Sequence, residues 1–406
     1  YEAEFRQRRA DGAWRWFVAR ALPARREPPD GAIHRWIGTA TDVTEPLDDA
    51  DARIGTLEAS IARITELTNH LTQAYGGDAA VPRSVAEPLV LLVAPLALDR
   101  YLMSVMILIL YFAFVGQAWN IMMGFCGQLS LGHALFVGLG AYTAAALYQH
   151  FGIIPWVGMI AAVIVCVAAA SIIGWLAFRF GIGGTYFALL TIAFAEFTRI
   201  GFDHFGWVGG SGGFFLRVVQ QEGFDWVNLR GRPIMFYYLA LGLAVFGFIV
   251  SAWLLRGRAG FYFRAIRDNE EAARAAGVDT FRYKMYAIQI SAALTALAGV
   301  FFAFFYNNLF PEQIFGIGRS IEIILAPVIG GIGTLFGPVL GAAVLTVASE
   351  GINAALSASG YEIPGVKQIL YGVALGLSIM FMPNGIWPGV ARMFGFARNR
   401  DGGRRE

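Results

Sequence analysis

Residues 101–123 read YLMSVMILILYFAFVGQAWNIMM, and this stretch decides the fold. It carries no charged side chain, and at about 1.5 Å per helical residue it can cross a hydrocarbon layer of about 30 Å. The whole chain agrees with it, since 57% of the residues are hydrophobic and 15% are charged, and the mean hydropathy is +0.56. The sequence therefore predicts an integral membrane protein from about residue 88 onward.

Similar apolar segments recur along the chain. The candidate membrane segments are 85–98, 101–123, 129–149, 154–178, 184–202, 233–255, 285–307, 320–332, 336–355 and 366–386. The first is short for a bilayer, and a run of helix breakers, GGIGTLFGP at 330–338, separates two of the last three. We expect an all-α polytopic membrane protein with about 8–10 membrane segments, some broken or re-entrant. Its transmembrane domain should span residues 85–390.

The front of the chain differs in kind. Residues 5–9, 14–21 and 33–41 are typical of short strands separated by Asp-Gly and Pro-Pro-Asp-Gly turns. Residues 1–46 as a whole resemble the C-terminal hairpins of a PAS sensory domain. Residues 47–84 carry apolar side chains at spacings of three and four, which fits a short coiled coil or a surface helix with one apolar stripe, followed by a linker. We expect a small α+β extension here and assign it no ligand.

Basic residues gather in two places. The loop after residue 255 carries Arg256, Arg258, Arg264, Arg267, Arg274, Arg282 and Lys284, and residues 391–406 form a basic tail. The positive-inside rule places both on the cytoplasmic side, which requires an even number of crossings between them. The loop 203–232 is then expected outside the cytoplasm and the N-terminal extension inside it.

The first of these loops contains a short, well-delimited helix. Residues 264–277 read RAIRDNEEAARAAG. Asp268 can cap the N-terminus, Glu271 sits where a capping box wants its carboxylate, and Gly277 can take the left-handed conformation after the last turn. The mixed charge of the loop suits a groove on a partner protein better than anionic lipid headgroups, which are the alternative.

Three membrane segments mix glycine with polar side chains, at 124–142, 181–196 and 330–341. Irregular backbone at membrane depth is tolerated only where protein buries it or water wets it, and interrupted helices in a transporter point to its pathway. The candidate pathway residues are Gln128, Ser130, Gly132, His133, Thr185, Tyr186, Glu196, Gly331 and Gly333. As alternatives, the glycines can serve close helix packing, His133 can bond a neighbouring helix, and Glu196 can pair with Arg199.

The chain offers little for catalysis. Cys126 and Cys166 match no metal or redox spacing and read as small buried hydrophobes. Neither lysine follows a glycine, so a phosphate-binding Gly-x-x-x-x-Gly-Lys-Ser/Thr loop is excluded. We expect no catalytic residue, no metal, no cofactor and no nucleic-acid partner. If ATP drives solute movement, its hydrolysis belongs to another polypeptide.

Four strings together resemble one family. GQLSLGHA (127–134), GTYFA (184–188), AIRDNE (265–270) and GGIGTLFGP (330–338) are similar, in order, to the permease subunits of branched-chain amino-acid ABC importers, and most of all to the M-type. The resemblance covers about residues 88–390. It implies that the helix near Glu270 couples to a cleft of an ATPase subunit. The implied coupling residues are Arg267, Asp268, Asn269, Glu270, Ala272, Ala273 and Gly277.

The resemblance also implies a second permease subunit in a heterodimer, two ABC ATPase subunits that hold the ATP, a periplasmic substrate-binding protein, and a multi-pass position in the bacterial inner membrane. The expected cargo is a leucine-like amino acid, with urea, amides or aromatic acids as alternatives. The PAS-like extension is not a family feature. Two other classes stay open: a membrane-anchored PAS-type sensor, and an ion-coupled secondary carrier with Glu196 as its intramembrane ionisable group.

Overall fold

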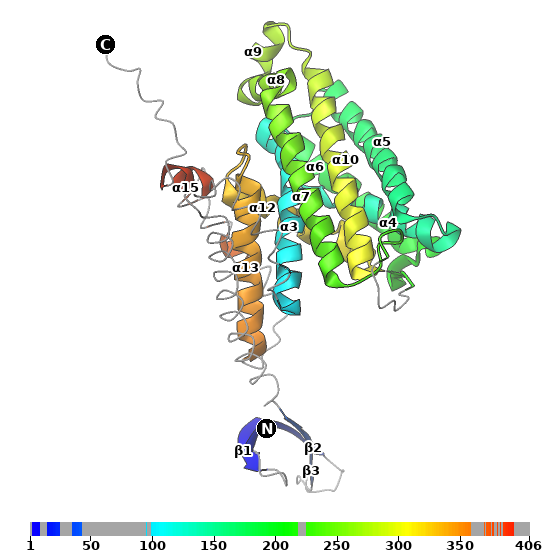
Figure 1. Cartoon of the computed structure of the whole chain (residues 1–406), viewed down its shortest axis with the longest axis vertical. Coiled ribbons are helices and arrows are strands. Elements are labelled where there is room, and N and C mark those ends of the chain that lie inside the picture. Colours follow the sequence, from blue (N-terminus) through cyan, green and yellow to red (C-terminus); the bar gives the residue numbers. More distant parts are fainter. Residues whose placement is uncertain are drawn as a thin grey trace, which may run out of the picture. The chain divides into compact units, whose positions relative to one another are not determined.

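The computed structural model describes position 95, residues 99–217 and 225–358, some positions between 369 and 393, and three strands within residues 2–42 (Figure 1). For the strands and for residues 353–358 and 391–393 only the backbone is described. The chain divides into two units, residues 100–348 with 367–406, and residues 1–99 with 349–366. The coiled coil predicted within 47–84 and the segment 85–98, apart from position 95, lie outside the described residues, and the segment 366–386 is described only in part.

The N-terminal strands form one antiparallel sheet in the order β1-β2-β3. They are β1 (Glu2–Arg8), β2 (Trp14–Ala24) and β3 (Arg35–Asp42). Arg8 pairs with Trp14 and Ala24 with Arg35, so the Asp-Gly and Pro-Pro-Asp-Gly sequences fall in the two connections. The three predicted strands are confirmed, and the likeness to a PAS domain stays a prediction.

Helices make up the membrane body, and they follow the predicted apolar segments. They are α3 (Arg100–Asn120), α4 (Ala134–Phe151), α5 (Pro155–Arg179), α6 (Gly184–His204), α7 (Pro233–Arg256), α10 (Thr280–Tyr306), α11 (Pro311–Phe315), α12 (Ile317–Gly330) and α13 (Gly337–Ala358). A π-helical turn (Ile121–Phe125) extends α3. In the described part of the chain, five stretches are long and apolar enough to cross a membrane: Arg100–Phe125, Pro155–Arg179, Pro233–Arg256, Thr280–Tyr306 and Pro311–Gly330. The chain is thus an all-α multi-pass membrane protein, as predicted.

Glycine and proline set several helix ends. Gly152, with a φ of 66°, ends α4, and Pro155 begins α5. Pro233 begins α7 in the same way. Proline is well tolerated at the first helical position because that residue has no intrahelical acceptor for its N–H in any case. The short connection between α4 and α5 makes these two helices antiparallel neighbours.

The helix α10 lies at the centre of the body and packs against α3, α4 and α5. Two glycines allow the close approach of α4. A Cβ on Gly299 would overlap the carbonyl oxygen of Val137, and a Cβ on Gly140 would stand 2.5 Å from the carbonyl oxygen of Ala296. Such contacts between small residues replace the hydrophobic driving force, which is weak between helices in lipid. The packing alternative for Gly140 is confirmed.

The helices α12 and α13 form a hairpin against α3, joined by residues 331–336. A Cβ on Gly116 of α3 would touch both Pro327 and Pro338, one from each arm of the hairpin. Within the hairpin, Gly330 and Gly341 allow the arms to meet, because a Cβ on either would overlap the backbone of the other arm. The predicted break in this segment is confirmed.

The loop between α6 and α7 is anchored to the end of α10. The strand β4 (Phe214–Phe215) pairs antiparallel with β5 (Asn308–Leu309), and Tyr142 Oη donates to the carbonyl of Leu309 at 3.1 Å. In the same loop the Asn228 side-chain amide, the largest cause, and backbone N–H groups hold the pKa of Asp225 below its usual value. The β4–β5 pair thus ties one part of this loop to the end of α10, and hydrogen bonds to Asp225 order another.

Candidate functional site

Two short helices, α8 (Arg258–Asp268) and α9 (Glu270–Ala275), connect α7 to α10 at one end of the bundle (Figure 1). The cap of α9 is Asn269, whose Oδ1 accepts from the backbone N–H of Ala272 at 2.9 Å. The prediction that Asp268 is the cap is wrong, since Asp268 is still helical and ends α8, while Asn269 is extended with a φ of −161°. Glu271 then stands one position too early for a capping box, so that prediction is also wrong.

The end of α9 has the predicted geometry. Gly277 has a φ of 87°. Its N–H donates to the carbonyl of Arg274 at 3.0 Å, and the N–H of Val278 donates to the carbonyl of Ala273 at 3.0 Å. These two bonds make a Schellman motif, which satisfies carbonyls that the last helical turn would leave unpaired. The helix α9 is therefore short but has a hydrogen-bonded stop at both ends.

One side of α9 faces the membrane body. The Glu270 carboxylate contacts the ammonium of Lys284 and accepts from Arg274 at 3.0 Å. Only 7% of the Lys284 side chain is exposed, and its Nζ lies 5.3 Å from the centre of the Phe178 ring at the end of α5. Ala273 is buried as well. Glu270, predicted to couple to a partner, thus holds α9 onto α10, and Ala273, predicted likewise, faces inward.

The other side of α9 is exposed. Glu271, Ala272, Arg274, Ala275, Ala276 and Gly277 are all exposed. This face combines one acidic and one basic side chain with a small apolar patch. It is the part of the predicted coupling helix that is open to a partner.

Arg267, the last basic residue of α8, points back toward the membrane body. Its Nη1 donates to the carbonyl of Gly124 at 2.8 Å, in the π-helical turn that extends α3. Its Nε and Nη2 donate to Asp268 Oδ1 at 3.2 and 3.1 Å. Asp268 therefore orients the arginine rather than capping α9.

Residues 126–133 are not helical, so α4 begins five residues later than the predicted start at 129. Trp119 Nε1 donates to the carbonyl of Ser130 at 2.9 Å. Thr191 Oγ1 of α6 accepts from the N–H groups of Leu131 and Gly132 at 3.1 and 3.3 Å. The backbone of this loop lacks helical hydrogen bonds, and these bonds take their place. Backbone polar groups buried at membrane depth need such partners because no water reaches them.

His133, at the end of this loop, bonds a neighbouring helix, which confirms the alternative given for it above. Its Nε2 lies 3.0 Å from Ser291 Oγ of α10, and Ser291 Oγ donates to the carbonyl of Ala118 at 2.6 Å. Because the single hydroxyl proton is used on Ala118, Nε2 carries the proton and donates. Gln128, Ser130 and His133 are all buried. Their assignment to a pathway stays a prediction.

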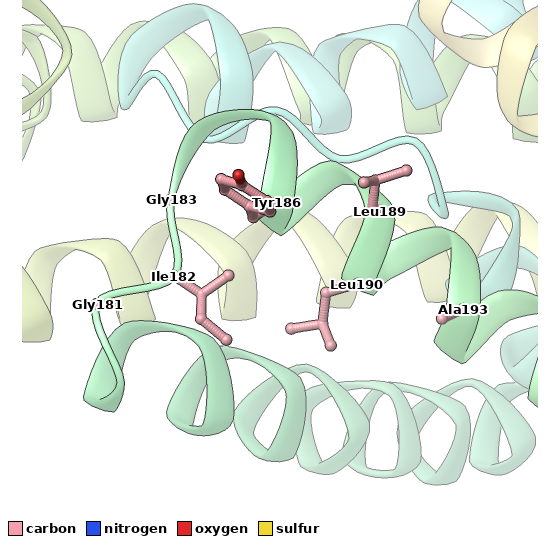
Figure 2. A pocket seen from close by; sticks show the side chains of 7 residues that line it. All are labelled: Gly181, Ile182, Gly183, Tyr186, Leu189, Leu190 and Ala193. Carbon is pink, nitrogen blue, oxygen red and sulfur yellow. The ribbon is translucent and has the colours of Figure 1, made fainter.

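A second group of predicted pathway residues lies on α6. Thr185, Tyr186 and Glu196 are exposed. A pocket of about 800 Å³ lies where α5 leads into α6, lined by Gly181, Ile182, Gly183, Tyr186, Leu189, Leu190 and Ala193 (Figure 2). Glu196 follows one turn beyond Ala193 on the same helix. The pairing predicted for it is confirmed, since Arg199 lies 2.6 Å from Glu196 Oε1 and 2.6 Å from Asp203 Oδ2.

The third group is the break between α12 and α13. Gly331 and Gly333 have φ values of 126° and 75°. The side chain of Asn120 holds this turn, because its Oδ1 accepts from Gly333 N at 2.8 Å and its Nδ2 donates to the Thr334 carbonyl at 2.9 Å. Gln117 Nε2 adds a bond to the Leu335 carbonyl at 2.5 Å. Sequence analysis missed Asn120, Gln117, Thr191 and Ser291, although polar side chains inside apolar segments were the signal.

The predicted residues therefore separate into two places. Arg267, Gln128 and Gly333 belong to segments that meet near the end of α3, whereas Thr185, Tyr186 and Glu196 share the exposed face of α6. Thr191, on the opposite side of α6, is the link between them. Within the described residues, no three His, Cys, Asp or Glu side chains are placed to hold a metal ion.

The family described as the permease component of branched-chain amino acid transport systems matches residues 101–381. The chain belongs to this family. It is a permease subunit of an ABC importer and works in a complex with other subunits.

Curated relatives share this assignment. The chain is 29% identical over 322 residues to the high-affinity branched-chain amino acid transport system permease protein LivM of Escherichia coli (strain K12), covering 74% of this chain and 73% of that protein. LivM of Salmonella typhimurium is 29% identical over 315 residues, with 72% of each chain covered. The autoinducer 2 import system permease protein LsrC of Yersinia pseudotuberculosis is 38% identical over 122 residues, 28% of this chain and 34% of that protein. No solved structure matches the chain.

Proposed function

We propose that this permease subunit imports branched-chain or related small amino acids across the bacterial inner membrane. The substrate class is supported by the names of the two LivM relatives, which align with about three quarters of the chain. The match to LsrC covers only 28% of the chain. A shared permease architecture explains that shorter match without a shared substrate.

The proposed partners are a second permease subunit, two ATPase subunits and a periplasmic substrate-binding protein. ATP would bind and be hydrolysed on the ATPase subunits. The basic loop that contains α8 and α9 would face the cytoplasm, together with the tail and the N-terminal extension. The loop between α6 and α7 would then face the periplasm and the binding protein.

The observation that carries this proposal is the construction of α9. It is capped by Asn269, closed at Gly277, and fixed on its inner side by the pair of Glu270 and Lys284. A rigid base with an exposed face of small residues suits insertion into a groove on another protein. Movement of the ATPase subunits would displace α9, and the helices attached to it would open the pathway to each side in turn.

Copurification tests this proposal. The proposed ATPase subunit, coexpressed with this permease, is expected to copurify with the wild-type chain, and its ATP hydrolysis should be faster with the loaded binding protein. Ala272→Trp places a large side chain on the exposed face of α9 and is expected to abolish copurification. Ala168→Trp is the matched control, because Ala168 is exposed in the middle of α5, at a depth that a water-soluble ATPase does not reach. Copurification that survives Ala272→Trp would contradict α9 as the docking element.

A further inference from the structure

Two glycine turns far apart in the sequence meet the same arginine. Gly127 follows the π-helical turn of α3, and Gly333 lies in the break between α12 and α13. Their φ values are 74° and 75°. A Cβ on Gly127 would stand 3.0 Å from Arg267 Cγ, and a Cβ on Gly333 would stand 2.8 Å from Arg267 Nη1. The side chain of Arg267 therefore lies against both turns, in space that only glycine leaves open.

The guanidinium also bonds the backbone at this point. Arg267 Nη1 donates to the Gly124 carbonyl at 2.8 Å. That carbonyl stands at the C-terminal end of a helix, where unpaired carbonyls and the helix dipole both favour a cation. A π-helical turn ends α3 here, and such turns are frequent at functional positions.

The two turns are tied to each other as well as to the arginine. Asn120 of α3 bonds Gly333 N and the Thr334 carbonyl. A Cβ on Gly124 would overlap Asn120 Oδ1 and stand 2.6 Å from Gly333 N. We name this contact of Asn120, Gly124, Gly127, Gly333 and Arg267 the glycine junction. Every member belongs to one unit of the chain.

The junction is joined to the exposed helix α9 through a short, stiff path. Arg267 is separated from the cap Asn269 by a single residue, Asp268, which itself bonds the guanidinium. On the inner side of α9, Glu270 is held by Lys284. A displacement of α9 must therefore either move the guanidinium together with Gly124 or break the hydrogen bond between them.

We infer that Arg267 is a positioning residue that transmits the movement of α9 to both interrupted segments, the end of α3 and the turn 331–336. This inference rests on the proposed function, because it requires that a partner moves α9. This role differs from docking, because Arg267 lies on the inner side of the coupling segment. Its task is to keep the glycine junction closed until α9 moves.

The chain contains its own probe of the junction. Its only two cysteines are Cys126, between Gly124 and Gly127, and Cys166 in α5. Both are fully buried. N-ethylmaleimide reacts with a buried thiol only when the surrounding structure opens, so its rate reports the population of the open form. Cys166 serves as the internal control in the same molecule.

The first measurement uses the full chain in lipid nanodiscs, without any partner. Arg267→Met keeps the aliphatic stem but removes the donors, and loss of one charge-assisted hydrogen bond is expected to speed modification of Cys126 about tenfold or more while Cys166 stays protected. Arg267→Lys keeps one donor and should give an intermediate rate. Arg264→Met is the matched control, because Arg264 bonds only Gly260 of its own helix among the contacts described.

A second variant reaches the junction without changing the arginine. Gly333→Ala places a methyl group 2.8 Å from Arg267 Nη1 and from the Gly124 carbonyl, and it should expose Cys126 in the same way. Gly181→Ala carries a similar backbone strain, with a φ of 69°, but its Cβ meets no atom within 4 Å. It should leave Cys126 protected.

The second measurement uses the complete transporter in vesicles. With Arg267→Met the ATPase subunits are expected to stay bound and to hydrolyse ATP. The rate of hydrolysis should no longer rise when the loaded binding protein is added. Uptake should fall about tenfold, the effect expected for loss of one charge-assisted hydrogen bond. Arg267→Lys should restore part of both.

The outcomes are separable. If N-ethylmaleimide modifies Cys126 at the wild-type rate in both Arg267→Met and Gly333→Ala, the inference is overturned. It is also overturned if a variant with faster Cys126 modification keeps normal uptake and normal stimulation of ATP hydrolysis by the loaded binding protein. Loss of ATPase binding by Arg267→Met would make it a docking residue and also overturn it. A wild-type transporter that neither binds an ATPase nor takes up amino acids would defeat the proposed function, whereas the thiol rates in nanodiscs would still report the junction.

Discussion

The helices α10 and α6 have opposite surroundings in the same subunit. In α10 even the polar side chains Lys284, Ser291 and Thr295 are buried. In α6, by contrast, Phe187, Ala188, Thr191 and Ala195 are the buried residues, whereas Tyr186 and Phe197 are each 76% exposed. The helix α10 is the scaffold on which the subunit is built, and α6 presents a face that lipid, water or another subunit must cover.

The charges on the two helices sharpen this difference. Lys284 of α10 has its charge enclosed by Glu270 and the Phe178 ring. Arg199 of α6 pairs with Glu196, whose side chain is 49% exposed. Ionic groups facing hydrocarbon are costly, so the exposed pair on α6 requires water or protein beside it. Stability should therefore depend on α10, and transport on α6.

The largest expected effect comes from one methyl group on α10. The Cβ in Gly299→Ala would overlap the carbonyl of Val137, and because backbone cannot rotate away, α4 must move. Overpacking of this kind should destabilise the chain by about 3 kcal/mol. The measurement is the temperature at which the buried cysteines react with a thiol-specific dye in detergent, together with the yield of folded protein.

Gly201→Ala is the same change on α6 and should have the opposite sign. No atom lies within 4 Å of a Cβ at Gly201, and alanine is favoured over glycine inside a helix by about 0.5–1 kcal/mol. Equal melting temperatures for the two variants would show that α10 and α4 do not approach as closely as described.

The next effect tests the hydrogen bonds by which Thr191 of α6 supports the loop 126–133. Thr191→Val removes the oxygen that accepts from Leu131 and Gly132. Leaving buried donors unpaired should cost about 2 kcal/mol, seen as a lower melting temperature and faster exchange of these two amides. Thr198→Val is the control, since Thr198 Oγ1 bonds only the Phe194 carbonyl of its own helix among the contacts described. Similar losses for both threonines would argue against a special role of the loop 126–133.

A smaller effect is expected at the charged pair of α10. Lys284→Met leaves the Glu270 carboxylate, 33% exposed, without its buried cation. Because water still reaches that carboxylate, we expect a loss of about 1–2 kcal/mol, below the value for a fully buried pair. Amide exchange in α9 should accelerate before exchange in the rest of the chain. Arg282→Met breaks a pair whose side chains are 74% and 47% exposed, and α9 should exchange at the wild-type rate.

Much of this fold is predictable from the sequence because apolar length and glycine or proline at segment ends are local signals. The α5 and α7 ends and the left-handed Gly277 follow from such signals. The late start of α4 does not. The glycines and polar side chains of residues 126–133 indicate a break, but the residue at which α4 begins depends on hydrogen bonds of this loop with Thr191 and Trp119.

The candidate site is harder to predict from the sequence, for the same reason. Asp268 and Asn269 are equally good caps, and only the backbone angle at Asn269 selects between them. The sequence predicts Glu270 as part of a docking surface, but Lys284, fourteen positions along the chain, turns it inward. The bond of Arg267 to Gly124 joins residues 143 positions apart. Such contacts depend on tertiary packing, which the spacing of residues along the chain does not encode.

The smallest effect on stability is expected where the effect on transport should be clearest. Glu196→Gln weakens an exposed pair within one helix, which is worth at most about 0.5 kcal/mol. Asp203→Asn removes the other carboxylate that pairs with Arg199, and Asp203 is only 20% exposed. If the pairs matter only for holding Arg199, both variants should lower uptake in vesicles equally. If the exposed face of α6 borders the solute path or the second permease, Glu196→Gln should lower uptake at an unchanged melting temperature and Asp203→Asn should not. Unaltered uptake by Glu196→Gln would remove this face of α6 from the pathway.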